Sequence, residues 1–258
     1  EEIIEFDLPI NPAVLLVDDD KGLDMETFYQ EVFHDIGLSY TYWNTERQGN
    51  PVKVNAYYPI TVWVTEWLRP TLTKSERQVI ESYLANGGSL FLAGQRVAFD
   101  LAATGIDDNE YRYSNGESNV FHESVLKAKL LNASTQYIEI VQVEDDPLGD
   151  GLSSMLVQPN HAQRNISPPA LQAVNGGIPF ARYIDGQTAA IRYDSTYNLI
   201  YTAFGGLETL PDDSLRQAFM RRAYQYLSGL DWELVPAFDL ENPALANTVG
   251  IRWNMPNP

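Results

Sequence analysis

Short apolar runs alternate with helix-like segments between residues 13 and 93, and this alternation limits the folds open to the chain more than any other feature. A run of four to eight apolar residues suits a strand buried on both faces, whereas apolar residues three and four apart suit an amphipathic helix. The sequence therefore predicts a mainly parallel sheet with helices on both faces, a three-layer α/β architecture. The expected strands lie at 13–17, 39–43, 60–65 and 89–93, and the expected helices at 25–36 and after the Thr73-x-x-Glu76 capping box.

The second half of the chain predicts antiparallel additions to this sheet. Three short apolar segments at 181–185, 189–193 and 199–204 are joined by tight polar turns, and a final helix follows from about residue 213. Between them, 118–131 is expected to be helical and 137–143 extended, while 144–180 shows no clear period. We expect residues 1–11 to be an N-terminal extension, 12–230 one α/β domain, and 231–258 a proline-rich tail or a linker to a further module.

Charge and cysteine content exclude several classes of function. The chain has 258 residues with 17 basic and 35 acidic side chains, giving a net charge of −18. Nucleic acids and anionic membranes attract clustered Lys and Arg, so neither is an expected partner, and no apolar run reaches the roughly 20 residues of a spanning helix. The chain contains no cysteine, which excludes disulfides, thiolate metal sites and a cysteine nucleophile.

An ordered set of segments resembles a known family. The segments AVLLVDDDKG, LSYTYWNT, TVWVTEW, LTKSERQVIESYLANGGSLFLAGQRVAFDL and AAIRYDSTYNLIYTAFGGLETL, spread over residues 12–230, are similar to the amidotransferase-like domains of large secreted bacterial proteins, including some metallopeptidases. The resemblance implies a flavodoxin-like fold related to class I glutamine amidotransferases and to trehalose-utilisation-type proteins. It also implies an extracellular setting, with no assigned activity for the domain itself.

The catalytic residues of a class I amidotransferase are missing. That chemistry needs a cysteine on a strand-to-helix turn and a histidine and glutamate that activate it. The turn falls at 93–96, where the sequence is Ala-Gly-Gln-Arg. The His-x-Glu segment falls near 204–208, where Glu208 stands in the place of the glutamate and glycine in the place of the histidine. The sequence thus argues against amidotransferase activity.

Polar and aromatic side chains gather at the predicted carboxyl ends of the strands, where open α/β sheets bind ligands. An acidic enzyme site is one interpretation, in which Asp19, Glu66 and Gln95 act on a glycan or peptide. The other is structural: the aspartates cap the next helix and Glu66 pairs with Arg96. The candidate pocket comprises Asp18, Asp19, Trp43, Glu66, Trp67, Gln95, Arg96 and Glu208.

Calcium is the one cofactor that the sequence suggests. Asp18, Asp20 and Asp24 alternate around Gly22, and hard cations bind several carboxylates on a flexible turn. An EF-hand glutamate is absent, since Tyr29 stands at that position. Solvated acidic turns are the competing interpretation, here and at 145–151. The three histidines match no zinc spacing.

These observations predict a non-catalytic binding or scaffold module of a secreted or cell-surface bacterial protein, with a hydrolase acting on glycan or peptide as the alternative. The expected partners are other domains of the same polypeptide or another protein, with a glycan or peptide also open. This prediction requires no cofactor, and calcium is the one ion that the sequence leaves open.

Overall fold

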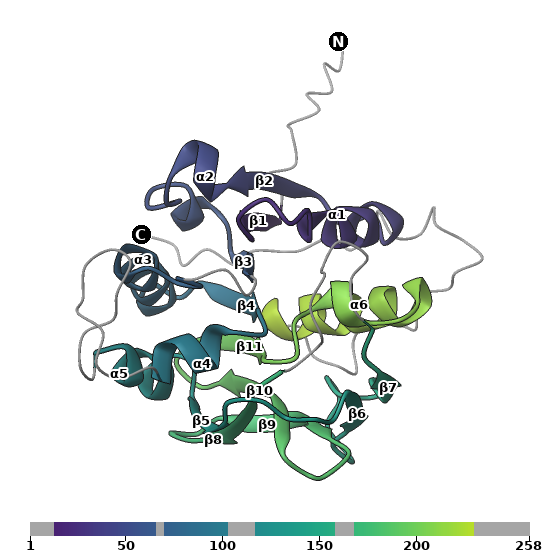
Figure 1. The fold of residues 1–258 in the computed structure, drawn as a ribbon. Helices are drawn as coiled ribbons and strands as arrows, with labels where there is room; N and C mark the ends of the chain where they lie inside the picture. Colours follow the sequence, from purple (N-terminus) through teal and green to yellow (C-terminus); the bar gives the residue numbers. More distant parts are fainter. Residues whose placement is uncertain (1–12, 66–69, 103–116, 158–167, 230–258) are drawn as a thin grey trace, which may run out of the picture.

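The computed structural model describes residues 13–65, 70–102, 117–157 and 168–229. These residues form one mixed sheet flanked by helices (Figure 1). Its strands are β1 (Val14–Asp19), β2 (Tyr40–Asn44), β3 (Ile60–Thr65), β4 (Ser89–Ala93), β5 (Ala128–Asn132), β6 (Glu139–Gln142), β7 (Ser154–Met155), β8 (Ala170–Ala173), β9 (Ile178–Tyr183), β10 (Thr188–Asp194) and β11 (Asn198–Thr202). The helices are α1 (Glu26–Asp35), α2 (Thr45–Gln48), α3 (Lys74–Ala85), α4 (Val97–Ala102), α5 (Glu117–Ser124) and α6 (Asp213–Leu227), with short 3₁₀ turns η1 (Asn55–Tyr57) and η2 (Leu207–Thr209).

The parallel part of the sheet has the order β2-β1-β3-β4-β11. The antiparallel strands β10, β9, β6 and β7 continue it beyond β11, and β8 and β5 branch from β10. This arrangement confirms the predicted three-layer α/β fold with antiparallel strands in the C-terminal half. The order reverses between β1 and β3, and such a switch point is where open α/β sheets form their ligand crevice.

Helices cover both faces of the sheet because successive strand residues point to opposite sides. In β1, Val14 and Leu16 pack with α1 and α6, whereas Leu15 and Val17 pack with α3, α4 and α5. Each face thus has its own apolar core. Trp63 of β3 is 1% exposed, so its predicted place in the core is confirmed.

Side-chain hydrogen bonds mark the start of α3 and the turn ahead of α1. The predicted capping box of α3 is present, with Thr73 accepting from the Glu76 amide and Glu76 accepting from the Thr73 amide. Ahead of α1, the Asp20 carboxylate accepts hydrogen bonds from the amides of Gly22, Leu23 and Met25. Asp20 therefore holds the turn ahead of α1, as the structural interpretation expects, although the N-cap residue of the helix itself, Met25, makes no side-chain cap hydrogen bond.

The middle of the chain departs from the predicted helix at 118–131. Helix α5 ends at Ser124, and β5 begins at Ala128 after Lys127 adopts a left-handed φ of 58°. The Lys127 side chain lies over the Tyr193 ring, with 4.3 Å between its Nζ and the ring centroid. Pairing of β5 with β8 outweighs the local helical pattern. Within the described residues, no helix is long and apolar enough to cross a membrane.

Candidate functional site at the carboxyl edge of the parallel strands

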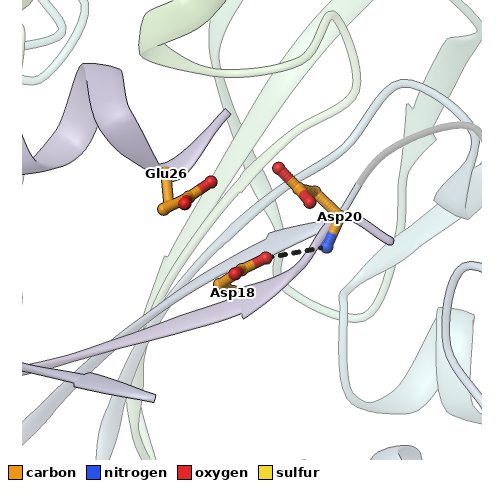
Figure 2. A group of neighbouring side chains, drawn as sticks. All are labelled: Asp18, Asp20 and Glu26. Carbon is orange, nitrogen blue, oxygen red and sulfur yellow. Dashed lines mark hydrogen bonds between the residues drawn. The ribbon is translucent and has the colours of Figure 1, made fainter. Parts of the chain in front are cut away.

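Three carboxylates converge beyond the carboxyl end of β1. Asp18 is the fifth residue of β1, Asp20 comes directly after the end of β1, and Glu26 is the first residue of α1 (Figure 2). One oxygen from each side chain lies within 4.8 Å of the others, so the three could hold a cation together. Asp18 and Asp20 are buried, while Glu26 is half-buried. We call these residues the carboxylate cluster.

Hydrogen bonds orient the first member of this cluster. The Asp18 Oδ2 atom accepts from the Tyr42 hydroxyl and from the Asn44 side-chain amide, both on β2. Its Oδ1 atom accepts from the Asp20 amide at 3.2 Å. Because parallel pairing sets Asp18 opposite Asn44, the strand register itself delivers these donors.

Burial, together with repulsion between carboxylates, raises the pKa of Asp20 and of Glu26. Burial, then the charges of Asp18 and Asp20, raises the pKa of Glu26 to about 7. Burial and Asp18 likewise raise the pKa of Asp20. The Oε2 atom of Glu26 is buried and has no hydrogen-bond partner in the described part of the chain. A bound cation would relieve this repulsion, as would a proton.

Asp19 lies apart from the cluster and is held by other groups. It points to the opposite face of β1, where its Oδ1 atom bonds Lys21 at 2.6 Å and Thr45 at 3.1 Å. Its Oδ2 atom accepts from the Trp63 indole at 3.2 Å. Burial, with a contribution from Glu76, raises the pKa of Asp19 to about 7. With its side chain fully buried and paired to Lys21, it does not face open solvent.

Glu208 is buried beneath the edge, in η2 after β11. Its Oε1 atom accepts from the Gly206 amide at 2.5 Å and its Oε2 atom from the Tyr29 hydroxyl at 3.3 Å. Burial raises the pKa of Glu208 to about 7, and the charge of Asp20 adds to the rise. This glutamate bonds its own loop and α1 instead of activating another side chain.

The two glycines before Glu208 leave no room for a histidine. A Cβ atom on Gly206 would lie 1.8 Å from the Tyr29 hydroxyl and 2.8 Å from the Ala93 Cβ. Gly205 has a φ of +105°, and a Cβ there would lie 2.5 Å from Glu208 Oε1. Distances under 3.0 Å require neighbouring atoms to move. The local packing is built around the absence of side chains at both positions.

The predicted strand-to-helix turn is present between β4 and α4. Gly94 is required there, since a Cβ would lie 2.7 Å from the Thr65 carbonyl oxygen. Gln95 lies in this turn, is 4% exposed, and its φ is not positive. The turn thus lacks the strained backbone that presents a nucleophile in related hydrolase turns. Arg96 is half-buried, with its guanidinium carbon 5.7 Å from the Phe99 ring centroid.

The remaining predicted site residues are dispersed or undescribed. Trp43 is half-buried and donates its indole N–H to the Gly49 carbonyl at 2.7 Å. Asp24 is exposed, with a φ of 57°, and lies outside the carboxylate cluster, where Glu26 takes its place. Glu66 and Trp67 lie outside the described residues, so their expected pairing and exposure stay predictions.

The second acidic turn is paired with arginines. Asp146 bonds Arg192 at 2.7 Å and the amides of Leu148 and Gly149. Asp150 bonds Arg222 at 3.0 Å. This pairing favours a structural role for the turn.

Sequence reasoning missed Glu26, although a signal for it exists. The alternation of Asp18, Asp20 and Asp24 with intervening residues reaches Glu26 two positions further on. Asp20 also accepts from the amide of Met25, the residue directly before the first turn of α1. The helix start thereby brings Glu26 to the cluster in place of Asp24.

Comparisons with known proteins support the fold. No protein-family model matches the chain, and no curated protein matches its sequence. Among solved structures, a glutamine amidotransferase from Thermotoga maritima is 12% identical with a TM-score of 0.50, covering 84% of this chain and 85% of its own. A cytoplasmic protein from Salmonella typhimurium LT2 is 13% identical with a TM-score of 0.52, and the match covers 83% of this chain and 98% of the Salmonella protein.

A further similar structure is a larger enzyme. The β-galactosidase of the psychrophilic Marinomonas ef1 is 14% identical with a TM-score of 0.51, and the match covers 90% of this chain. It covers only 31% of the β-galactosidase, so this chain spans about a third of that protein. At these identities the similarities establish the fold, which is amidotransferase-like and flavodoxin-like, and they carry no activity with them.

Proposed function

We propose that this domain is a non-catalytic binding or scaffold module with an amidotransferase-like fold. The observation that carries the proposal is the packing around Gly205 and Gly206, which leaves no space for the side chain of an activating histidine. The strand-to-helix turn, where the nucleophile would lie, holds Gln95. The absence of any cysteine in the chain agrees with it. An amidotransferase needs both groups, because the thiolate attacks and the histidine shuttles the proton.

The module is proposed to act within a larger, secreted or cell-surface protein. Two observations support this. The resemblance of residues 12–230 is to domains of large secreted bacterial proteins, and the fold recurs as about a third of the β-galactosidase. Other domains of the same polypeptide, or a separate protein, are the partners we propose, and a glycan or peptide is the ligand class open to it.

Calcium is the cofactor we propose for the carboxylate cluster. Asp18, Asp20 and Glu26 offer the oxygen ligands that this cation prefers, and Asp18 is already oriented by Tyr42 and Asn44. Burial is the main cause of the raised pKa of Glu26, and a cation bound to the cluster would remove the further rise that the charges of Asp18 and Asp20 add. The domain would then be stabilised by the ion, which the unfolded chain cannot hold in the same geometry.

A hydrolase is the second candidate, favoured by one observation. Glu26 and Glu208 each have a pKa raised to about 7, which is near the value that suits general acid–base catalysis at neutral pH. Against this stands the pairing of Asp19 with Lys21 and the enclosure of Glu208 by Gly206 and Tyr29. Raised pKa values of this kind also arise in structural networks.

A hydrolysis panel separates the two candidates. The purified chain is incubated with L-glutamine, aryl glycosides and a labelled peptide mixture, with and without calcium. We expect no product above the buffer blank in any arm. Turnover that is lost in both Glu26→Gln and Glu208→Gln, while the exposed control variant Glu139→Gln retains it, would overturn the proposal and establish the hydrolase.

A further inference from the structure

The two helices on one face of the sheet, α1 and α6, enclose a surface groove. They lie side by side (Figure 1), and the groove between them has a volume of about 470 Å³. Ligand pockets in proteins commonly measure about 300–1,000 Å³. Phe28 and Val32 of α1 form its apolar floor, and Val32 is 3% exposed. The groove and the carboxylate cluster both involve α1, but none of the cluster residues lines the groove.

Carboxylates dominate the rim of this groove. Glu31 and Asp35 line it from α1, and Asp213 lines it from the first turn of α6. Asp35 accepts from the Gln217 side-chain amide at 3.0 Å, a hydrogen bond between the two helices. Its Oδ1 atom also lies 3.3 Å from Nδ1 of His34, an exposed side chain that lines the groove as well. Glu31 is exposed and forms no ion pair with the described residues. The rim therefore offers negative charge to a ligand.

Arg216, the arginine that lines the groove, is bonded to neighbouring groups of the domain. Arg216 donates to the carbonyl oxygens of Leu207 and Leu210 and pairs with Asp213 at 2.6 Å. Its guanidinium also stacks over Phe28, 4.8 Å from the ring centroid. An anionic ligand would find no free donor on this side chain, so the groove favours a cation with an apolar body.

We propose that the α1–α6 groove docks a basic, partly apolar segment of a partner protein. Lysine or arginine side chains of that segment would approach Glu31 and Asp35, and its apolar residues would cover Phe28 and Val32. The net charge of −18 would steer such a segment towards the domain, and complementary charge raises association rates. This inference rests on the proposed function as a binding module and names the partner's chemistry.

Fluorescence anisotropy with a labelled peptide that alternates arginine and leucine tests the inference. We expect saturable binding to the full chain, with affinity about threefold to tenfold lower for Glu31→Gln/Asp35→Asn, because solvent-exposed ion pairs are individually weak. The matched control, Glu139→Gln/Asp185→Asn, removes the same charge from exposed positions on β6 and the β9–β10 turn. It is expected to bind like the unaltered chain.

Three outcomes would overturn the groove proposal. They are equal loss of affinity in both double variants, unchanged affinity in the groove variant, and binding of spermidine as tight as that of the peptide. The first would indicate attraction to overall charge alone, and the last would show that the apolar floor contributes nothing. None of them produces turnover in the hydrolysis panel, so failure here is distinguishable from failure of the proposed function.

Discussion

Replacing Glu208 with glutamine should stabilise this domain above neutral pH. The carboxyl is buried, and its pKa is raised from 4.5 to about 7. Glutamine has nearly the same shape and still offers an oxygen to the Gly206 amide, the donor 2.5 Å from Glu208 Oε1. The substitution thus removes a buried charge while keeping this hydrogen bond.

The sign and size of the effect follow from proton binding. Between pH 4.5 and 7 the folded chain holds a proton on Glu208 that the unfolded chain has lost, so stability falls as pH rises through this range. Each pKa unit corresponds to about 1.4 kcal/mol, which gives a cost of about 3 kcal/mol for the ionised side chain above pH 7. The glutamine variant escapes this cost.

Urea unfolding followed by tryptophan fluorescence measures the difference, with EDTA present at both pH 5 and pH 8. We expect Glu208→Gln to match the unaltered chain within about 1 kcal/mol at pH 5 and to exceed it by about 3 kcal/mol at pH 8. A variant that is less stable than the unaltered chain at pH 8, or a gain that is the same at both pH values, would contradict a raised pKa for Glu208.

Three further predictions concern other parts of the site and core. Gly206→Ala should lower the free energy of unfolding by about 1–3 kcal/mol, because the new methyl group collides with the Tyr29 hydroxyl. Removing that hydroxyl in the double variant Gly206→Ala/Tyr29→Phe should restore part of the loss. If urea unfolding shows that the losses of the two single variants simply add in the double variant, the prediction is wrong. Burial lowers the pKa of His122 from 6.5 to about 3, so the folded state loses stability as the pH falls below 6.5. Between pH 7 and pH 4 the unfolding free energy of the unaltered chain should fall by about 3 kcal/mol more than that of His122→Phe. Equal falls in the two proteins, measured by urea unfolding at both pH values, would contradict this. Calcium should raise the melting temperature, the rise should disappear in Asp18→Asn/Glu26→Gln and persist in Asp24→Asn, and a shift retained by the double variant would place the ion elsewhere.

The parallel half of the fold could be predicted from the sequence because its signals are local. Residues 13–17 and 60–65 are continuous apolar runs, as strands buried on both faces require, and Thr73 and Glu76 mark the start of α3 directly. Each of these features depends on side chains within a few positions of one another. The structure confirms all of them.

The β5 region could not be predicted in the same way. The apolar residues around Leu126 and Leu130 suit a helix as well as a strand, and long-range pairing with β8 decides between them. The left-handed backbone at Lys127 ends the helical path, and no sequence rule assigns that conformation to a lysine. Tertiary context overrides the local pattern here.

The candidate site was predictable in position but not in membership. Strand ends and the switch point locate the edge, and Asp18 lies there as expected. Which acidic residues join the cluster depends on the direction of each side chain. The pleat of β1 points Asp19 to the other face of the sheet, where it bonds Lys21 and Trp63. The path of the chain after Asp20 brings Glu26 close to Asp18 and Asp20. These are consequences of three-dimensional geometry that spacing alone does not contain.

The thiol pKa of a Gln95→Cys variant tests the central claim most directly. The chain has no other cysteine, so thiolate absorbance at 240 nm reports this position alone. Because glycines stand at 205 and 206 in place of the histidine and several carboxylates lie along the edge, we expect a thiol pKa of about 8.5 or higher and no release of ammonia from L-glutamine. A thiol pKa well below 7, together with glutamine hydrolysis, would contradict it and show that the edge still activates a nucleophile.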